Sequence, residues 1–214
     1  MIKISPSMLS CDFAKVGEEL RSMKESGADM VHLDVMDGNF VTNISFGLSV
    51  IESIRKDSDM IFDVHLMIDR PERYAERFIK AGADILTFHI EATEKSEEIL
   101  KTIRSLGCKA AISVKPNTPA EAVFELLPLC DMVLVMTVEP GYGGQAFMPE
   151  MLDKIRKLKA EIDRLGLSCD IQVDGGINTE TAKQAIAAGA NILVAGSAVF
   201  KAADRRAVIE KLRG

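Results

Sequence analysis

The sequence predicts a single (β/α)8 TIM barrel over residues 1–214, with parallel strands inside and helices outside. Three features predict this fold. Eight short apolar runs of strand length recur along the chain, amphipathic stretches separate them, and no linker or low-complexity tract divides the repeat. Continuous apolar character is typical of parallel strands covered on both faces. The runs are residues 3–8, 30–35, 61–67, 85–90, 110–114, 132–137, 171–173 and 191–195.

Helices are expected between these runs, among them residues 14–26, 72–81, 95–106 and 149–165. A glycine follows several helical stretches, as at Gly27, Gly82 and Gly189. Glycine is the usual residue there because it adopts the left-handed conformation that ends a helix. An open, doubly wound sheet is the alternative fold. It is disfavoured because the first run lacks the glycine-rich dinucleotide fingerprint that would follow it.

Composition narrows the class of protein. The chain has 26 Lys and Arg against 32 Asp and Glu, a net charge of −6, which argues against general nucleic-acid binding. No apolar run approaches the ~20 residues of a membrane span, and the opening does not resemble a signal peptide. Cys11, Cys108, Cys130 and Cys169 lack the paired spacing of a zinc ribbon. We therefore expect a cytoplasmic protein with reduced thiols and no membrane partner.

Polar residues at strand ends form a candidate metal site. His32 and Asp34 alternate on one run, His65 lies near the end of the next, and Asp174 ends the seventh. In a barrel these ends converge on one mouth, and two His with two carboxylates suit Zn²⁺, Mn²⁺, Fe²⁺ or Co²⁺. The alternative interpretation is that each residue only caps a loop. His89, at the end of the fourth run, is expected to support the site rather than to be a fifth ligand.

Met36, Met67 and Met136 also lie near strand ends. Methionine usually fills irregular gaps in a core. At these positions the same residues are expected to form an apolar lining around the reacting centre.

Glycine-rich turns follow the last three runs, at residues 139–145, 174–177 and 195–197. In barrels the loops after the seventh and eighth strands often bind phosphate through backbone N–H groups. Ser197 is expected to be the N-cap of the following helix and a phosphate donor. The sequence therefore predicts an anion site at this side of the mouth.

Five segments in order resemble the ribulose-phosphate 3-epimerases: residues 5–13, 32–41, 63–67, 135–145 and 173–177. This resemblance implies a (β/α)8 barrel with one divalent metal, most often zinc, and interconversion of D-ribulose 5-phosphate and D-xylulose 5-phosphate. It also implies a homo-oligomer, a dimer or a hexamer.

The resemblance also implies residue roles. His32, Asp34, His65 and Asp174 would bind the metal, and Asp34 and Asp174 would be the catalytic acid and base. Ser7 and His65 would contact the sugar. The remaining substrate contacts would be Gly141, Tyr142, Gly143, Gly144, Asp174, Gly175, Gly176, Gly196 and Ser197.

The chain departs from the family pattern at a few positions. Thr42 and Leu48 stand where Pro is usual, Cys11 replaces a usual Ala and Tyr142 a usual Phe. Thr42 leaves the substrate open, because D-allulose-6-phosphate 3-epimerases share the metal and acid–base residues. A metal-free phosphate enzyme with a barrel fold and a non-catalytic sugar-phosphate binder are further alternatives.

The hypothesis for the chemistry is proton transfer at C3. One carboxylate removes the proton next to the C2 carbonyl, which leaves a 2,3-enediolate, and the other returns a proton on the opposite face. A cation would offset the developing charge, and the remote phosphate would position the sugar. The loop at residues 141–147 is expected to close over the substrate.

Overall fold

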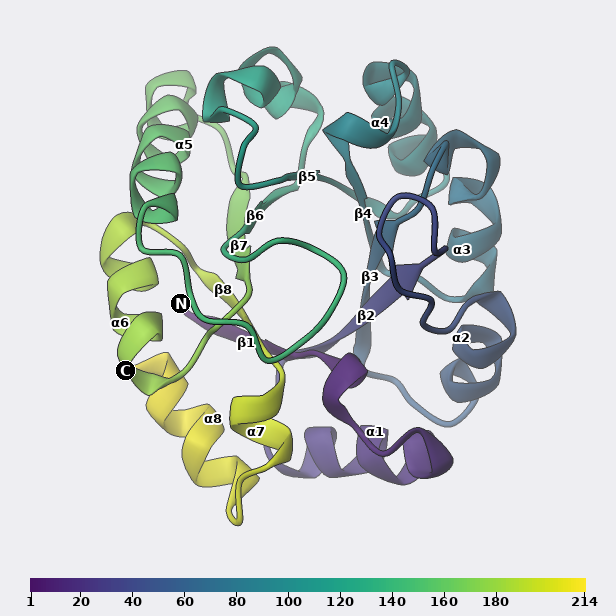
Figure 1. Ribbon diagram of the computed structural model, residues 1–214. Coiled ribbons are helices and arrows are strands. Elements are labelled where there is room, and N and C mark those ends of the chain that lie inside the picture. The colour runs from purple at the N-terminus through teal and green to yellow at the C-terminus, as the bar shows by residue number, and fades with distance from the viewer.

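The computed structural model describes residues 1–214 and contains one eight-stranded parallel sheet surrounded by helices (Figure 1). The predicted barrel is confirmed. The strands are β1 Lys3–Pro6, β2 Met30–Met36, β3 Ile61–Met67, β4 Ile85–His89, β5 Lys109–Val114, β6 Met132–Met136, β7 Asp170–Asp174 and β8 Ile192–Ala195. The helices are α1 Val16–Glu25, α2 Leu48–Arg55, α3 Ala75–Ala81, α4 Ser96–Ser105, α5 Met151–Leu165, α6 Thr179–Ala188, α7 Ser197–Phe200 and α8 Arg205–Arg213.

The barrel closes between its first two strands. Seven strand pairs run in sequence from β2 through β8 to β1, each parallel. Between β1 and β2 the sheet has a single bridge, which pairs Ser7 with His32. The place where the barrel closes therefore lies at Ser7 and His32, two of the residues expected to form the site.

The same type of hydrogen bond recurs near the starts of the strands. Each even-numbered strand is preceded by a polar side chain that accepts a hydrogen bond from the backbone N–H of the strand before it. The four bonds run from Ile4 to Asp29 at 2.7 Å, Phe62 to Asp84 at 2.8 Å, Ala110 to Asp131 at 2.9 Å and Ile171 to Asn191 at 2.8 Å. The bonds satisfy strand-edge donors that would otherwise face the bottom of the barrel.

The helix-ending glycines are confirmed. Gly82, Gly166 and Gly189 cap α3, α5 and α6 with φ of 117°, 64° and 118°. One connection differs from the expected strand–helix repeat: a 3₁₀ segment, η5 Ala120–Leu129, joins β5 to β6. Pro128 lies inside it, and proline supplies no N–H for a regular α-helical bond.

The barrel interior changes character along its axis. At the end where the strands begin, Met30, Ile85, Met132 and Ile192 pack together with Ala111. The four large residues are the first of the even-numbered strands, as expected for layers built from alternate strands. Above them the interior is polar yet buried, with Ser5, His32, Asp63, Thr87, Ser113 and Gln172 all 0% exposed.

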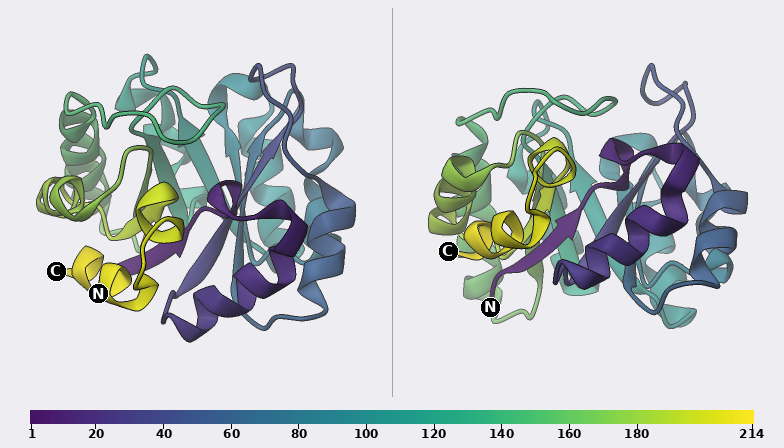
Figure 2. Two further views of the ribbon diagram at one scale, coloured as in Figure 1. Left: turned by 60° about the horizontal axis from the view of Figure 1, so that its bottom comes forward. Right: turned by 90° about the horizontal axis from the view of Figure 1, so that it is seen from below.

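The larger apolar core lies between the sheet and the helices. Two long loops stand above the carboxyl ends of the strands. The loop between β6 and α5 arches across the barrel mouth, and the loop between β2 and α2 rises beside it (Figure 2). None of the helices has both the length and the apolar character needed to cross a membrane.

Candidate active site

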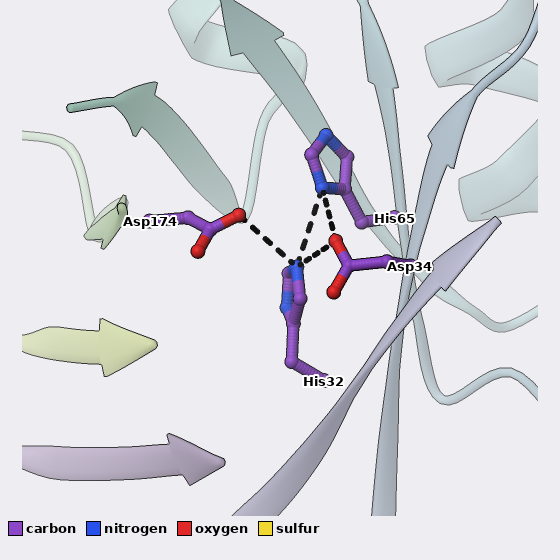
Figure 3. Close-up of side chains that lie close together, drawn as sticks. All are labelled: His32, Asp34, His65 and Asp174. Carbon is purple, nitrogen blue, oxygen red and sulfur yellow. Dashed lines mark hydrogen bonds and ion pairs between the residues drawn. The ribbon is translucent and has the colours of Figure 1, made fainter. Parts of the chain in front are cut away.

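Four side chains from three strands point toward one another at the barrel mouth (Figure 3). His32 and Asp34 share the inner face of β2, His65 comes from β3, and Asp174 ends β7. Nε2 of His32, Oδ1 of Asp34 and Nδ1 of His65 lie 3.2–3.3 Å from one another. Oδ2 of Asp174 lies 3.9 Å from the same His32 nitrogen. One donor atom from each residue falls within 4.8 Å of all the others.

This donor set fits a divalent transition metal. Nitrogen and oxygen ligands lie about 2.0–2.2 Å from such an ion, so ligand atoms around it are about 3–4 Å apart. The observed separations match that spacing. Asp34 is 3% exposed and the His32 and His65 side chains are fully buried. Buried charge of this kind requires a counter-charge.

Asp63 holds the first of the two histidines. Its Oδ2 lies 2.7 Å from Nδ1 of His32 and also accepts hydrogen bonds from Ser5 (3.2 Å) and Gln172 (2.5 Å). A carboxylate at Nδ1 keeps a proton on that nitrogen and turns Nε2 toward the cluster. Burial alone would lower the pKa of His32, but Asp63 and Asp34 raise it well above the ordinary value.

The two aspartates of the cluster have opposite proton affinities. Burial would raise the pKa of Asp34, but His32 and His65 hold it well below the usual range. Burial, with the nearby charge of Asp34, raises the pKa of Asp174 to about 7. One carboxyl is therefore poised to be ionised while the other carries a proton, an arrangement suited to acid–base chemistry.

A cavity opens above the cluster beneath the β6–α5 loop. Of the four clustered side chains, His32 and His65 lie below its floor and do not line it. The other residues singled out from the sequence line it together: Ser7, Asp34, Met36, Met67, Met136, Gly141, Tyr142, Gly143, Gly144, Asp174, Gly175, Gly176, Gly196 and Ser197. The three methionines form part of its apolar wall.

Two glycines of this cavity are required by close approach. A Cβ on Gly175 would lie 2.5 Å from the Val138 side chain, and one on Gly176 would lie 2.3 Å from the backbone nitrogen of Phe147. Both also have positive φ, of 124° and 66°. The turn after β7 can therefore pack under the β6–α5 loop only without side chains.

A model of the Ribulose-phosphate 3 epimerase family matches residues 3–200. The chain belongs to this family. Among its relatives, the ribulose-phosphate 3-epimerase of Bacillus subtilis (strain 168) is 46% identical over 215 residues, which cover 100% of this chain and 99% of that protein. The ribulose-phosphate 3-epimerase of Synechocystis sp. is 47% identical over 214 residues, covering 99% of this chain and 93% of that one. This family member is accordingly an isomerase of the racemase and epimerase class.

Solved structures with little sequence identity share the fold of this epimerase. A crystal structure of 3-hexulose-6-phosphate synthase superposes with a TM-score of 0.72 at 22% identity, covering 99% of this chain and 98% of that one. A mutant tryptophan synthase alpha-subunit from Pyrococcus furiosus has a TM-score of 0.72 at 16% identity, with the same coverage of both chains. These likenesses show the barrel alone.

One local expectation for the epimerase is wrong. Ser197 is the first residue of α7 rather than its N-cap. Gly196 occupies the N-cap position, with no side-chain hydrogen bond. A Cβ at Gly196 would lie 2.5 Å from Oγ of Ser10, so this position has room only for glycine while the serine stays in place.

Several site residues of the epimerase were not singled out from its sequence. Ser10, Gln145 and Asn178 line the cavity, and Asp63 supports the cluster from below. Asp63 lies two residues before His65 on β3, so both side chains point to the same face of the sheet. This two-residue period was the sequence signal that could have identified Asp63. Gln145 donates hydrogen bonds to the carbonyls of Glu139 (2.6 Å) and Tyr142 (2.9 Å) and so ties the β6–α5 loop to itself.

Proposed function

We propose that this epimerase interconverts D-ribulose 5-phosphate and D-xylulose 5-phosphate by inverting the configuration at C3. The observation that carries the proposal is the pair Asp34 and Asp174. They approach the cluster from β2 and β7 on opposite sides of His32 (Figure 3), and their pKa values are displaced in opposite directions. The relatives from Bacillus subtilis and Synechocystis are ribulose-phosphate 3-epimerases, which supports the pentose phosphate as substrate.

The reaction requires two proton transfers on opposite faces of one carbon. The hydrogen at C3 is acidic because it lies next to the C2 carbonyl, so its removal leaves a 2,3-enediolate. In one direction Asp34, ionised, takes this proton while Asp174, protonated, supplies one to the other face. In the reverse direction the roles exchange. The methionine wall keeps bulk water from competing with these transfers.

His32, Asp34, His65 and Asp174 would hold one divalent cation, with Zn²⁺ the first candidate and Mn²⁺, Fe²⁺ or Co²⁺ as alternatives. Bound there, the cation would offset the negative charge that develops on the substrate oxygens. The mutual distances of the four donor atoms support this assignment.

The phosphate is proposed to bind at the glycine-rich turns. Gly143 and Gly144 come from the β6–α5 loop, Gly175 and Gly176 follow β7, and Gly196 follows β8. Their backbone N–H groups can approach an anion closely because no side chain intervenes. Ser7 and Ser197 are proposed to bind the sugar and the phosphate, respectively. Holding the remote phosphate positions C3 between the two carboxylates.

The decisive experiment follows the C3 hydrogen. Conversion of D-ribulose 5-phosphate in deuterated water should place deuterium at C3, detected by NMR or mass spectrometry. Retention of the original hydrogen at C3 throughout the conversion would rule out a mechanism in which one carboxylate removes the C3 proton and the other returns a proton from solvent. Metal content of the same preparation, and loss of activity with a chelator followed by recovery with Zn²⁺ or Mn²⁺, tests the cation separately.

Substrate size is tested by comparing the kinetics of the pentulose and hexulose phosphates. D-allulose 6-phosphate is the competing substrate, because Thr42 in the β2–α2 loop and Leu48 at the start of α2 stand where the family usually has proline. We expect kcat/KM for the pentulose phosphate to exceed that for the hexulose phosphate by at least about tenfold. The opposite order would reassign the substrate while leaving the proton-transfer chemistry intact.

Cellular context is proposed from the relatives. A rice homologue is named a cytoplasmic isoform, which supports a cytoplasmic location for this chain. We also propose that residues 1–214 act as one domain and that the protein forms a homo-oligomer, a dimer or a hexamer. Light scattering of the purified protein measures the oligomer directly.

A further inference from the structure

A chain of hydrogen bonds runs from the cluster to a carboxylate outside it. Nδ1 of His65 faces Asp34 and His32, while Nε2 of His65 lies 2.9 Å from Nε2 of His89. On its far side, Nδ1 of His89 lies 3.3 Å from Oε2 of Glu91. Both imidazole side chains are completely buried, and their ring planes are inclined by 29° with centroids 5.0 Å apart.

Glu91 is held in place from another strand end. Its Oε1 accepts hydrogen bonds from the backbone N–H of Lys115 at 2.8 Å and from the hydroxyl of Thr118. Both groups follow β5, whereas Glu91 follows β4. The other oxygen, Oε2, is left for His89. An ionised carboxylate accepts and cannot donate, so this contact requires a proton on Nδ1 of His89.

An aromatic ring from another loop also fixes His89. The ring of Phe40, in the β2–α2 loop, packs on it with centroids 4.8 Å apart. Nζ of Lys115 lies 3.7 Å from the centroid of the Phe40 ring. His89 is therefore clamped between His65 and Phe40, and rotation of its ring would break contacts on both sides.

One proton arrangement of the two neutral rings satisfies both hydrogen bonds outside the cluster, from His65 to His89 and from His89 to Glu91. Two Nε2 atoms at 2.9 Å share a single proton, so the tautomers of the two rings are linked. With its proton on Nδ1, neutral His89 can only accept at Nε2. His65 must then carry its proton on Nε2, which leaves the lone pair of Nδ1 directed at the cluster.

We propose that Glu91 is a positioning residue that acts through His89 to select the His65 tautomer able to bind a cation at Nδ1. This inference rests on the proposed function, because it assumes that His65 is a metal ligand. The two histidines of the cluster are then oriented in different ways. Asp63 contacts His32 directly, whereas Glu91 acts on His65 through an intervening imidazole.

We call the chain from Glu91 through His89 to His65 the relay. Glu91→Gln is the variant that reverses the proton positions along it. The amide oxygen must keep the position of Oε1, because the Lys115 N–H can only donate there. The amide N–H group then faces Nδ1 of His89 and donates to it. The proton of His89 moves to Nε2, and that of His65 moves to Nδ1, where it competes with the cation.

The first readout is cation affinity, measured by competition of Zn²⁺ or Co²⁺ with a chromophoric chelator. We expect Glu91→Gln to weaken binding about 10–100-fold. Glu94→Gln is the matched control, because it removes the same charge three residues along the same loop and has no hydrogen bond to His89. In a His89→Phe background, Glu91→Gln should have no further effect. An equal loss in the Glu94→Gln control, or an undiminished loss in the His89→Phe background, would overturn the relay.

The second readout is the tautomers themselves, in metal-free protein with nitrogen-15-labelled histidine. The chain has only 3 histidines, so each imidazole spectrum can be assigned. We expect Nε2–H on His65 and Nδ1–H on His89 in the unmodified protein, and the reverse in Glu91→Gln. Should that variant not fold, the unmodified protein still tests the tautomers. A protein that binds no cation contradicts the proposed metal site, whereas normal binding in Glu91→Gln contradicts the relay alone.

Discussion

The hydroxyl of Ser7 lies 2.6 Å from Oδ2 of Asp34, and the backbone of the same serine forms the bridge to His32 that joins β1 to β2. One residue therefore closes the barrel and holds a carboxylate of the site. The other oxygen of Asp34 faces the two histidines, so Ser7 determines which edge of the carboxylate is turned to the cluster.

Replacement of Ser7 by Ala should affect activity more than folding. The variant loses a buried hydrogen bond to a charged acceptor, so we expect the free energy of unfolding to fall by about 1–3 kcal/mol. Without the bond Asp34 is held only through its other oxygen, by His32 and His65, and kcat should fall at least about tenfold. Urea titration and a coupled assay measure the two effects. Ser113→Ala is the control, because the buried Ser113 hydroxyl has no partner to lose.

Removing either of the two carboxylates proposed to transfer the C3 proton should stop turnover while the barrel stays folded. We expect Asp34→Asn and Asp174→Asn each to lower kcat by at least about 10³-fold, because an amide can neither accept nor return the C3 proton. Circular dichroism checks the fold and the coupled assay checks turnover. Asp59→Asn serves as the control, since that residue is exposed and paired only with Lys24. Near-normal turnover in either site variant would eliminate the scheme with two carboxylates.

Asp63 should control cation binding without touching the cation. In Asp63→Asn the carboxylate that holds Nδ1 of His32 becomes an amide, and His32 loses the partner that fixes its tautomer. We expect cation affinity to fall about 10–100-fold. Isothermal titration with Zn²⁺ measures this loss. Affinity unchanged from the starting protein would show that His32 keeps its orientation by packing alone.

In the metal-free protein, the contribution of Asp174 to stability should be lost as the pH rises toward neutral. Folding raises the pKa of Asp174 to about 7 from an ordinary value of 3.8, through burial and the charge of Asp34. The raised pKa stabilises the fold fully below about pH 4, and this contribution is lost as the pH rises to about 7. Metal-free Asp174→Asn should therefore be more stable than the starting protein at pH 8, by about 1–3 kcal/mol, and similar to it near pH 4. Urea titrations across this range test the difference, and parallel curves for the two proteins would contradict it.

The positions of the strands could be predicted closely from the sequence. The expected runs agree with the observed strands to within two residues at each end, because apolar character must persist wherever a strand is covered on both faces. The helix-ending glycines were equally readable. The 3₁₀ connection at η5 was not, since apolar spacing alone does not distinguish it from an α-helix.

The sequence by itself determined the barrel, the strand ends at which polar residues meet, and the family. Local patterns carry that information, because the apolar runs of strands and the glycines that end helices are properties of residues close together in the chain. Only the tertiary structure decided which polar residues support the others. Asp63 reaches His32 from the neighbouring strand, Glu91 reaches His65 through His89, and Ser7 meets Asp34 where the sheet closes. These contacts depend on barrel curvature and on side-chain rotamers, which bring together residues that no sequence spacing relates.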